Sequence, residues 1–272
     1  MKVLNRPLGV TLVELIVVIA ITSIIAAVVA VFIRRPVEGY ADAARRASLT
    51  DEADTALRRM SRDLRRALPN SVRVDGTGKF VEFIEVTDGG RYRAEKGSNP
   101  VDDPLDFSIA DGSFDVLGPL PTVVAGNQIV VYNLYSTGSA SNAYAGDNRA
   151  AFVSTGLPSK INIASTLFPE PSPAKRFHVV TGPVTYGCIN GQLLRYSGYA
   201  YNAAQVAPPA GGSSAILAGN VDVGECRFVY TAGALTERIG TVAIILQINS
   251  TSAGGGLERV RMFQQAQVVN TP

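Results

Sequence analysis

A single acid, Glu14, interrupts the apolar stretch that runs from Val10 to Ile33. An acid at the centre of a bilayer costs about 2.5–3.5 kcal/mol, so this carboxylate needs either a partner or a function. As a helix, the stretch would be roughly 36 Å long, enough to cross a hydrocarbon core of about 30 Å. The sequence therefore predicts a membrane anchor with one chemically unusual residue. A simpler interpretation, in which the acid is merely tolerated at the membrane interface, stays open.

Basic residues flank the predicted anchor on both sides. Lys2 and Arg6 precede it, so the tendency of cytoplasmic flanks to be positive places the N-terminus in the cytoplasm and the bulk of the chain outside. Arg34 and Arg35 argue weakly for the opposite orientation. An ordinary secretory signal is disfavoured, because the apolar run is longer than a typical one of about 7–15 residues and the nearest A-x-A pattern, at 41–43, lies well beyond it.

The string GVTLVEL, which begins at Gly9, resembles the prepilin signal of the type IV pilin family. In that family a dedicated peptidase cleaves after the glycine and methylates the new N-terminus. The resemblance thus implies cleavage between Gly9 and Val10 and N-methylation of Val10, where the family usually has phenylalanine. It also implies that Glu14 is the assembly carboxylate, which pairs with the α-amine of an adjacent subunit. A pair within one subunit is the alternative, since one helical turn separates the two charges.

Composition gives no sign of an enzyme. The net charge of +2 argues against a general nucleic-acid binder. Cys188 and Cys226 are the only cysteines, and a disulfide is the economical interpretation for an extracytoplasmic segment. With His178 they offer too few ligands for a zinc site, so no metal or other cofactor is expected. His178 could belong to a Ser–His–Asp arrangement, but its RFHVV context favours a strand surface or a core position.

An amphipathic helix is predicted over residues 37–68, after Pro36 and before Pro69. At helical spacing, Asp54 can pair with Arg58, and Asp63 can pair with Arg59 and Arg66. An apolar stripe with steps of three or four residues marks the buried face: Ala53, Leu57, Met60, Leu64 and Leu68. A cluster of arginines marks another face, which favours a solvated surface or salt bridges to neighbouring subunits over contact with DNA: Arg58, Arg59, Arg62, Arg65 and Arg66.

From Val72 onward the apolar period changes to two, which indicates strands. Residues 79–86 predict a strand, with a turn at Asp88-Gly89-Gly90 and a second strand after it. Residues 96–128 predict an irregular excursion and 136–148 an exposed loop. Asn190-Gly191 predicts a hairpin turn. The remaining predicted strands are 129–135, 183–188, 193–199, 226–230, 240–248 and 258–269, with glycine-rich turns at 232–240 and 250–256.

Two clusters could in principle bind a ligand. A group of aspartates lacks the spacing of a calcium loop, so turn capping is the favoured interpretation: Asp102, Asp103, Asp106, Asp111 and Asp115. A group of tyrosines could line a sugar or peptide site, but alternating strand positions favour packing: Tyr186, Tyr196, Tyr199 and Tyr201.

The predicted fold class is α+β, with a long N-terminal helix packed on an antiparallel sheet, as in type IV pilins. The expected divisions are a leader (1–9), a transmembrane or filament-core helix (10–35), an amphipathic helix (36–69) and a β-rich head (70–272). Blocks such as FVEFIEVTDGGRYRAE and RFHVVTGPVTYGC resemble minor pilin-like subunits of mannose-sensitive haemagglutinin (MSHA) pili.

This resemblance implies a structural subunit that is processed by the prepilin peptidase and N-methyltransferase. Its expected partners are the inner membrane, other major and minor pilins and the assembly platform, with no nucleic acid. The expected location is the inner membrane, with the head in the periplasm or in an extracellular pilus. The alternatives are a type II secretion pseudopilin of the minor J/K type, a tip adhesin or DNA-capturing minor pilin, and a membrane-anchored periplasmic enzyme.

Overall fold

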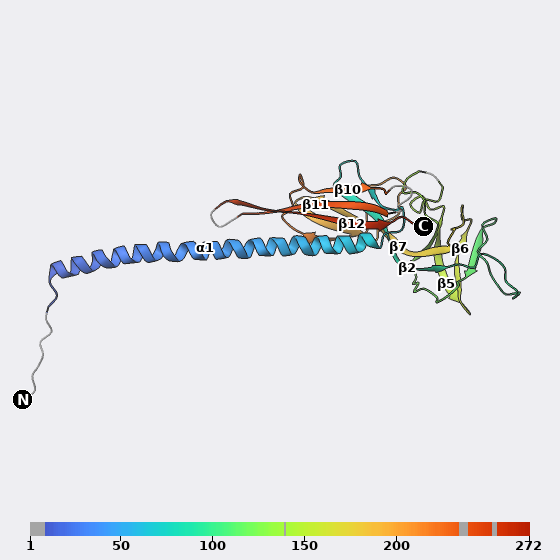
Figure 1. The fold of residues 1–272 in the computed structure, drawn as a ribbon, viewed down its shortest axis with the longest axis horizontal. Coiled ribbons are helices and arrows are strands. Elements are labelled where there is room, and N and C mark those ends of the chain that lie inside the picture. Colours follow the sequence, from blue (N-terminus) through green and yellow to red (C-terminus); the bar gives the residue numbers. More distant parts are fainter. Residues whose placement is uncertain (1–8, 139, 234–238, 252–254) are drawn as a thin grey trace, which may run out of the picture. The chain divides into compact units, whose positions relative to one another are not determined.

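The computed structural model describes residues 9–138, 140–233, 239–251 and 255–272 (Figure 1). Within these residues the chain forms one helix, α1 (Leu12–Arg65), and twelve strands. Two compact units are distinguished. The first contains the helix up to Ser48 together with Thr251–Glu258, and the second contains Leu49–Ser250 with Arg259–Pro272. The predicted α+β architecture, a long N-terminal helix followed by antiparallel sheet, is confirmed.

The helix α1 is continuous through Pro36, so the two predicted helices are one. A proline inside a helix removes a single backbone hydrogen bond while its fixed φ remains helical, and the 54-residue helix accommodates that loss. The helix ends at Arg65 rather than at residue 68. The cause is a competing partner, because the Leu68 N–H donates to the Ile84 carbonyl at 2.8 Å and Ala67 forms a bridge with Glu85.

The apolar stripe of the second half of α1 is buried, as predicted. Its side chains from Ala53 to Leu64 are at most 1 % exposed and join one hydrophobic cluster with the sheets. Leu68 is equally buried but belongs to a separate small cluster around Ile84 and Tyr144. The sheet side chains of the main cluster are Val81, Phe83, Val184, Tyr186, Val242, Ile244, Leu246, Ile248, Ala266 and Val268, with others.

Nine of the strands make one antiparallel sheet in the order β1-β2-β7-β4-β5-β6-β3, to which β8 and β9 add beside β7. The long strand β7 (Arg176–Ile189) holds this sheet together, since it pairs with β2, β4 and β8. The other bounds are β1 (Arg73–Val74), β2 (Phe80–Arg91), β3 (Asp111–Asp115), β4 (Gln128–Val131), β5 (Arg149–Gly156), β6 (Lys160–Thr166), β8 (Gln192–Ser197) and β9 (Ser213–Ala218).

The turn predicted at Asp88-Gly89-Gly90 is wrong, because β2 continues through these residues to Arg91. The strand contains irregular register between Glu85 and Asp88 and then pairs Gly89 with His178 and Gly90 with Phe177. Both glycines allow a close approach of β7. A Cβ atom on Gly89 would lie 2.8 Å from the Phe177 carbonyl oxygen, and one on Gly90 would lie 2.9 Å from the Phe177 ring. The glycine pair is therefore needed for the close packing of β2 against β7 and does not form a turn.

Residues 92–175 form a lobe with a hydrophobic cluster of its own. It contains β3–β6. Strand β3 lies inside the stretch 96–128 that was predicted to be irregular, and β5 and β6 lie where no element was predicted. The loop predicted to be exposed at 136–148 contains no strand among its described residues, but residues 141–144 are buried. The predicted strand 129–135 is shortened to β4, since Tyr132 adopts a positive φ of 50°. Aromatic contacts mark the interior of the lobe, including Phe114 edge-on to Phe177 at 5.2 Å. The first half of β7 thus packs against the lobe, while the second half of β7 contributes its side chains to the main hydrophobic cluster.

The last three strands form a separate antiparallel sheet, β10 (Arg227–Thr231), β11 (Ile239–Thr251) and β12 (Leu257–Val269), in that order. These strands were predicted, as was the hairpin turn between β7 and β8. Asn190 and Gly191 both have positive φ, 51° and 74°, as a type I′ turn requires. The predicted turns at 232–240 and 250–256 fall partly outside the described residues.

The close approach at Gly89 generates a stability prediction. Gly89→Ala should lower the free energy of unfolding by about 1–3 kcal/mol, since the new methyl group meets the backbone of β7. Gly76→Ala is the matched control, because no atom lies within 4 Å of its Cβ position and its φ is not positive. That change should leave stability unchanged or raise it by at most about 1 kcal/mol. Urea unfolding followed by circular dichroism measures both; equal effects would contradict the packing explanation.

Candidate functional site

The predicted cleavage site lies immediately before α1. Gly9 and Val10 are both outside the helix, which begins at Leu12. Both residues are exposed, with Val10 at 71 %, and nothing lies within 4 Å of a Cβ built on Gly9. The Gly9–Val10 peptide bond is therefore in non-helical, accessible chain, which is the form that a peptidase needs.

Thr11 caps the N-terminus of α1, a role that the sequence analysis did not assign. Its side-chain oxygen Oγ1 accepts a hydrogen bond from the Glu14 N–H at 3.3 Å, and its carbonyl accepts one from the Leu15 N–H at 3.1 Å. Thr11 and Glu14 have the Thr-x-x-Glu spacing of a capping box, the signal that could have revealed this cap. The cap places the Glu14 carboxylate in the first turn of the helix, where the helix dipole favours negative charge.

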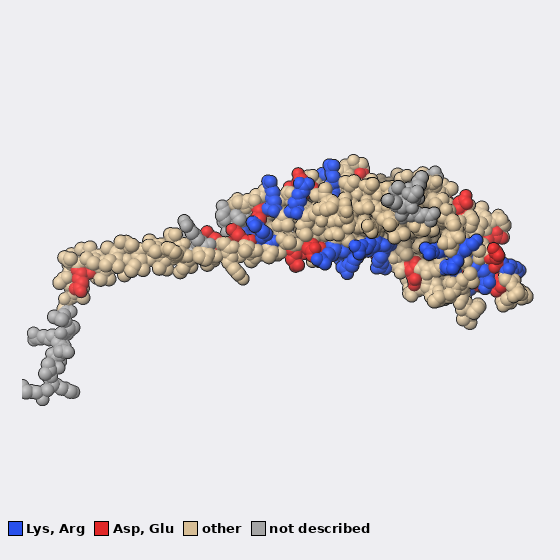
Figure 2. All heavy atoms as spheres, in the orientation of Figure 1, with Lys and Arg blue, Asp and Glu red and all other residues tan. Residues whose placement is uncertain are grey.

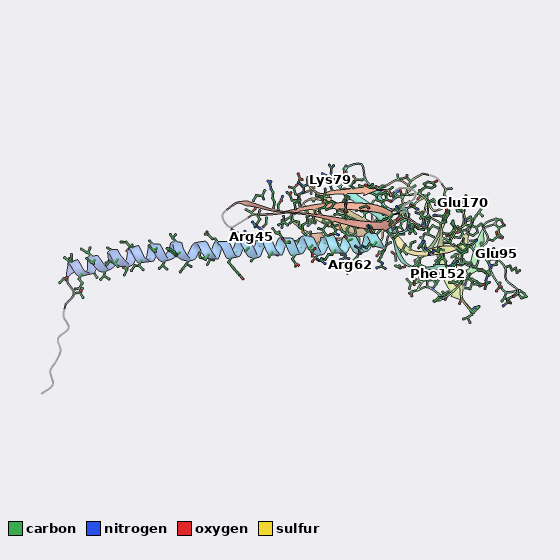
Figure 3. All side chains as sticks on the ribbon, viewed as in Figure 1. Arg45, Arg62, Lys79, Glu95, Phe152 and Glu170 are labelled. Atoms are coloured by element: carbon green, nitrogen blue, oxygen red, sulfur yellow. A yellow bond between two sulfur atoms is a disulfide. The ribbon has the colours of Figure 1, made fainter. Side chains whose placement is uncertain are left out.

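The apolar side chains in the first half of α1 are exposed among the residues that the structure describes. Its side chains stand free along the helix (Figure 3), and the space-filling view shows an almost uncharged surface there (Figure 2). Leu12 and Phe32, near its two ends, are both 74 % exposed. The polar Thr22 bonds back to the carbonyls of Val18 and Ile19, so its hydroxyl is satisfied inside the helix. By length and composition, α1 is the one described helix that could cross a membrane.

Further along α1, the end of the β11–β12 pair is tied to the helix. Arg45 donates to the Thr251 carbonyl at 2.9 Å, and Arg46 forms a 2.7 Å ion pair with Glu258. Asp42 and Arg45 also pair along the helix at 3.3 Å. Thr251, at the end of β11, and Glu258, near the start of β12, thus contact α1 directly.

Cys188 and Cys226 are joined by a disulfide, with a Cα–Cα distance of 6.4 Å. Both are buried in the main cluster. Cys188 is on β7 of the nine-stranded sheet, and Cys226 immediately precedes β10 of the three-stranded sheet. The bond therefore links the two sheets that cover the second half of α1.

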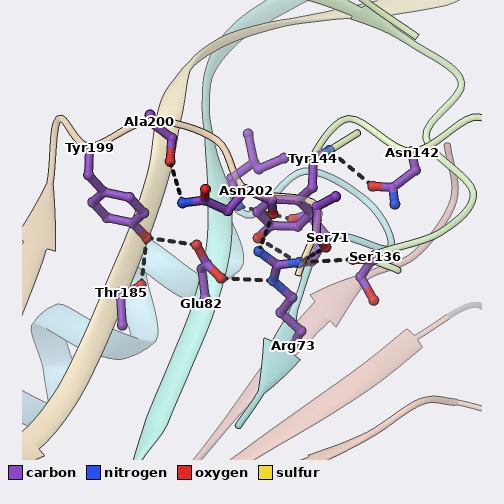
Figure 4. Close-up of polar contacts among 12 residues, drawn as sticks. Ser71, Arg73, Glu82, Ser136, Asn142, Tyr144, Thr185, Tyr199, Ala200 and Asn202 are labelled. Atoms are coloured by element: carbon purple, nitrogen blue, oxygen red, sulfur yellow. Dashed lines mark hydrogen bonds and ion pairs between the residues drawn. The ribbon is translucent and has the colours of Figure 1, made fainter. Parts of the chain in front are cut away.

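A buried ion pair that the sequence analysis missed holds the centre of the head (Figure 4). Arg73 of β1 donates from Nε to the Glu82 carboxylate of β2 at 2.8 Å, and both side chains are at most 5 % exposed. The guanidinium also stacks 3.6 Å from the centre of the Tyr144 ring and donates to the carbonyls of Asn202 and Ala203. Groups from three separate segments of the chain, at Glu82, Tyr144 and Asn202–Ala203, thus surround the guanidinium of Arg73.

Tyr199 completes this network from the other side of Glu82. Its hydroxyl donates to the second carboxylate oxygen at 3.0 Å and also contacts the Thr185 hydroxyl at 2.5 Å. Burial and the adjacent carboxylate raise the pKa of Tyr199 well above its usual value, so the phenol stays protonated. Because the partners of Glu82 are all internal, the network is structural, and the interpretation of the tyrosines as packing residues is favoured.

A second polar network ties α1 to the sheet and corrects the pairing predicted for Asp63. This carboxylate faces the sheet, where it accepts from the Tyr186 hydroxyl at 2.5 Å and from Arg195 Nε at 3.1 Å, rather than from arginines of its own helix. Arg195 also pairs with Glu85 at 3.2 Å. The predicted Asp54–Arg58 pair does form, at 2.5 Å.

The aspartate cluster of the lobe is used for ion pairs and turns. Arg93 pairs with Asp102 and Asp115, and Lys160 pairs with Asp103 at 2.7 Å. No group of three or more potential metal ligands occurs in the part of the chain that the structure describes. Asp106 accepts from the Ser108 N–H and hydroxyl, and Asp111 accepts from the Ser113 N–H, which is the predicted turn capping; the other three aspartates make ion pairs instead.

His178 lies near the start of β7, between Gly89 of β2 and Val130 of β4. Its Nε2 atom is buried and has no hydrogen-bond partner among the described residues. Burial, and secondarily the charge of Arg176, lower the pKa of His178 to about 4. The imidazole is therefore neutral at physiological pH and serves as a packed strand residue.

Comparison with protein-family models finds the prokaryotic N-terminal methylation motif at residues 4–30. No curated protein and no solved structure gives a significant match. The motif is the prepilin signal of type IV pilin-like proteins, and it supports a type IV pilin or pseudopilin. It points to a structural subunit rather than an enzyme, to processing by prepilin peptidase and to association with pilus machinery. With the apolar helix, it indicates a membrane-anchored chain with a C-terminal head.

The environment of His178 generates a pH prediction. Its pKa is about 4 in the folded state and 6.5 in the reference state, so an unfolded chain binds this proton first. Protonation of His178 therefore favours the unfolded chain. The free energy of unfolding is at its highest above pH 6.5, and it falls by a total of about 3 kcal/mol as the pH is lowered towards 4 and below. Urea unfolding of the chain and of His178→Gln, measured between these pH values, should show a shallower decline for the variant. Parallel declines would contradict the assignment.

Proposed function

We propose that this chain is a minor pilin-like subunit of a type IV pilus, of the MSHA type. The single observation that carries the proposal is a prepilin motif at the start of an uncovered apolar helix. A helix of this kind needs a bilayer before assembly and neighbouring helices after it. The folded head, with its closed polar networks and lack of a metal-ligand cluster in its described residues, suits a structural role.

The proposed maturation starts on the cytoplasmic side of the inner membrane. The prepilin peptidase cleaves between Gly9 and Val10, and its N-methyltransferase activity modifies Val10. The exposed, non-helical residues 9–11 support this step. Cleavage removes Lys2 and Arg6 with the leader, which leaves the α-amine of Val10 as the nearest positive charge to Glu14.

The proposed role of Glu14 is to guide assembly. Its carboxylate lies in the first helical turn and is exposed, so the α-amine of an adjacent subunit can reach it. Pairing is favoured because an unpaired acid in an apolar filament core would keep its desolvation penalty. The subunit would then be inserted in the filament, or would prime it, through contacts with major and minor pilins on the assembly platform.

The choice of an MSHA-type pilus comes from the sequence blocks of the head, which resemble biogenesis protein O of such pili. The lobe of residues 92–175 supports a minor rather than a major subunit, since the resemblance implies larger heads for minor subunits. The same motif and fold would suit a type II secretion pseudopilin, and gene neighbours would separate the two. We place the head in the periplasm, or outside the cell in the assembled pilus.

Gly9→Ala should block cleavage, because the peptidase is expected to require glycine before the cut. The variant should retain its leader, which intact-mass measurement of the membrane fraction detects as the added mass of residues 1–9. Gly39→Ala, another open glycine without positive φ, is the control and should be processed normally. Normal cleavage of the Gly9 variant would remove the processing proposal.

Glu14→Gln keeps the size of the side chain and removes its charge. The variant should still be inserted and cleaved, but its amount in sheared surface filaments should fall by at least about tenfold, because a buried charge pair is lost. Glu14→Asp retains the charge and should restore part of the incorporation. Immunoblots of filament and membrane fractions measure the ratio. Wild-type incorporation of the glutamine variant would refute the assembly role of Glu14.

A further inference from the structure

The last turns of α1 carry an arginine face that the proposed function does not use. All five of its arginines are exposed, and of these only Arg58 has an ion-pair partner, Asp54, in the described part of the chain. Figure 2 shows these side chains as a continuous basic strip along the helix. The members of this arginine face are Arg58, Arg59, Arg62, Arg65 and Arg66.

The arginine face borders an open groove of about 590 Å³ between α1 and β12. Arg62 lies on the exposed side of the helix in Figure 3. Ser61 also lines the groove; it is only 6 % exposed, and its Oγ atom is buried without a hydrogen-bond partner in the described chain. A buried hydroxyl without a partner is costly, which points to a ligand that supplies one. The groove is lined by Asp54, Arg58, Ser61, Arg62, Arg65 and Gln264.

The other wall of the groove belongs to an edge strand. Within the described residues β12 has a strand partner, β11, on one side only. Its stretch from Met262 to Val269 contains no charge, proline or glycine, and Phe263 on it is 59 % exposed. Natural proteins usually protect such edges with lysine, proline or bulges, because free N–H and C=O groups recruit another strand. The edge of β12 is therefore open to strand addition.

The charges of the groove define what can add there. Arg58, Arg62 and Arg65 extend about 10 Å along the helix. Three alternate residues of an extended strand cover about 13 Å, which is long enough to reach all three arginines. Alternate side chains of an added strand would point to the same side, so acids at every second position would meet the arginines. A second copy would bring a like-charged face, which disfavours pairing of this chain with itself.

We propose that this groove binds an extended acidic segment of a different protein, added as a strand to β12 with its carboxylates on the arginines of α1. The identification of that protein as a neighbouring subunit of the filament rests on the proposed function; the binding chemistry does not. The groove would thereby make this subunit a partner for unlike neighbours rather than for its own copies.

The test uses the full chain purified in detergent and a blocked peptide of alternating threonine and glutamate as the probe. Fluorescence anisotropy should show binding that weakens with added salt. The triple variant Arg58→Gln, Arg62→Gln, Arg65→Gln should weaken it by about tenfold or more, as expected for three exposed ion pairs. The matched control removes three positive charges from exposed residues that belong neither to α1 nor to β12: Arg91→Gln, Lys96→Gln and Arg227→Gln. It should leave affinity unchanged.

Two further probes separate the components of the proposal. A peptide of the same sequence with N-methylated backbone amides should lose binding, because it cannot pair with β12. A peptide with lysine in place of glutamate should not bind. Equal binding of the methylated peptide, or an equal loss in the control triple variant, would overturn the proposal. So would tighter binding of duplex DNA to this groove, or self-association that the groove variant abolishes. These outcomes do not depend on cleavage at Gly9 or on assembly through Glu14.

Discussion

The constraint on which the structure depends is the uncovered apolar surface in the first half of α1. Each buried methylene is worth about 0.8 kcal/mol of transfer free energy, so a run of exposed leucine, isoleucine and valine cannot remain in water. Lipid or other helices must cover it, and either environment penalises an unpaired carboxylate at Glu14. The proposed cleavage at Gly9 and the proposed pairing of Glu14 both follow from these two demands on one helix.

The second half of α1 differs from the first, because its apolar side chains are covered by the head. Its apolar residues follow a single stripe, from Ala53 to Leu64, and pack into the sheets of the head. Its polar side chains lie on two different faces of the helix. Asp63 is drawn inward by Tyr186 and Arg195, whereas the arginine face stays in solvent. The Cys188–Cys226 bond and the buried Arg73–Glu82 pair then hold strands and loops of the head together.

Features that depend on neighbouring residues could be predicted from the sequence. The stripe of α1, the Asn190-Gly191 turn and the last three strands all carry their signal in local period or turn chemistry. Features that depend on distant partners could not. Gly89 is explained only by the approach of Phe177 on β7, and the Arg73–Glu82 pair only by the register of β1 on β2. The cap at Thr11 was the exception, because its Thr-x-x-Glu signal was present in the sequence and was not used.

The central claim is that this chain reaches a filament as a cleaved and methylated subunit. Tandem mass spectrometry of the N-terminal peptide, from protein recovered in sheared surface filaments, tests it most directly. The account predicts N-methylvaline, derived from Val10, as the first residue. A chain that retains Lys2 and Arg6, begins beyond the apolar helix, or is found only in the membrane fraction would contradict it.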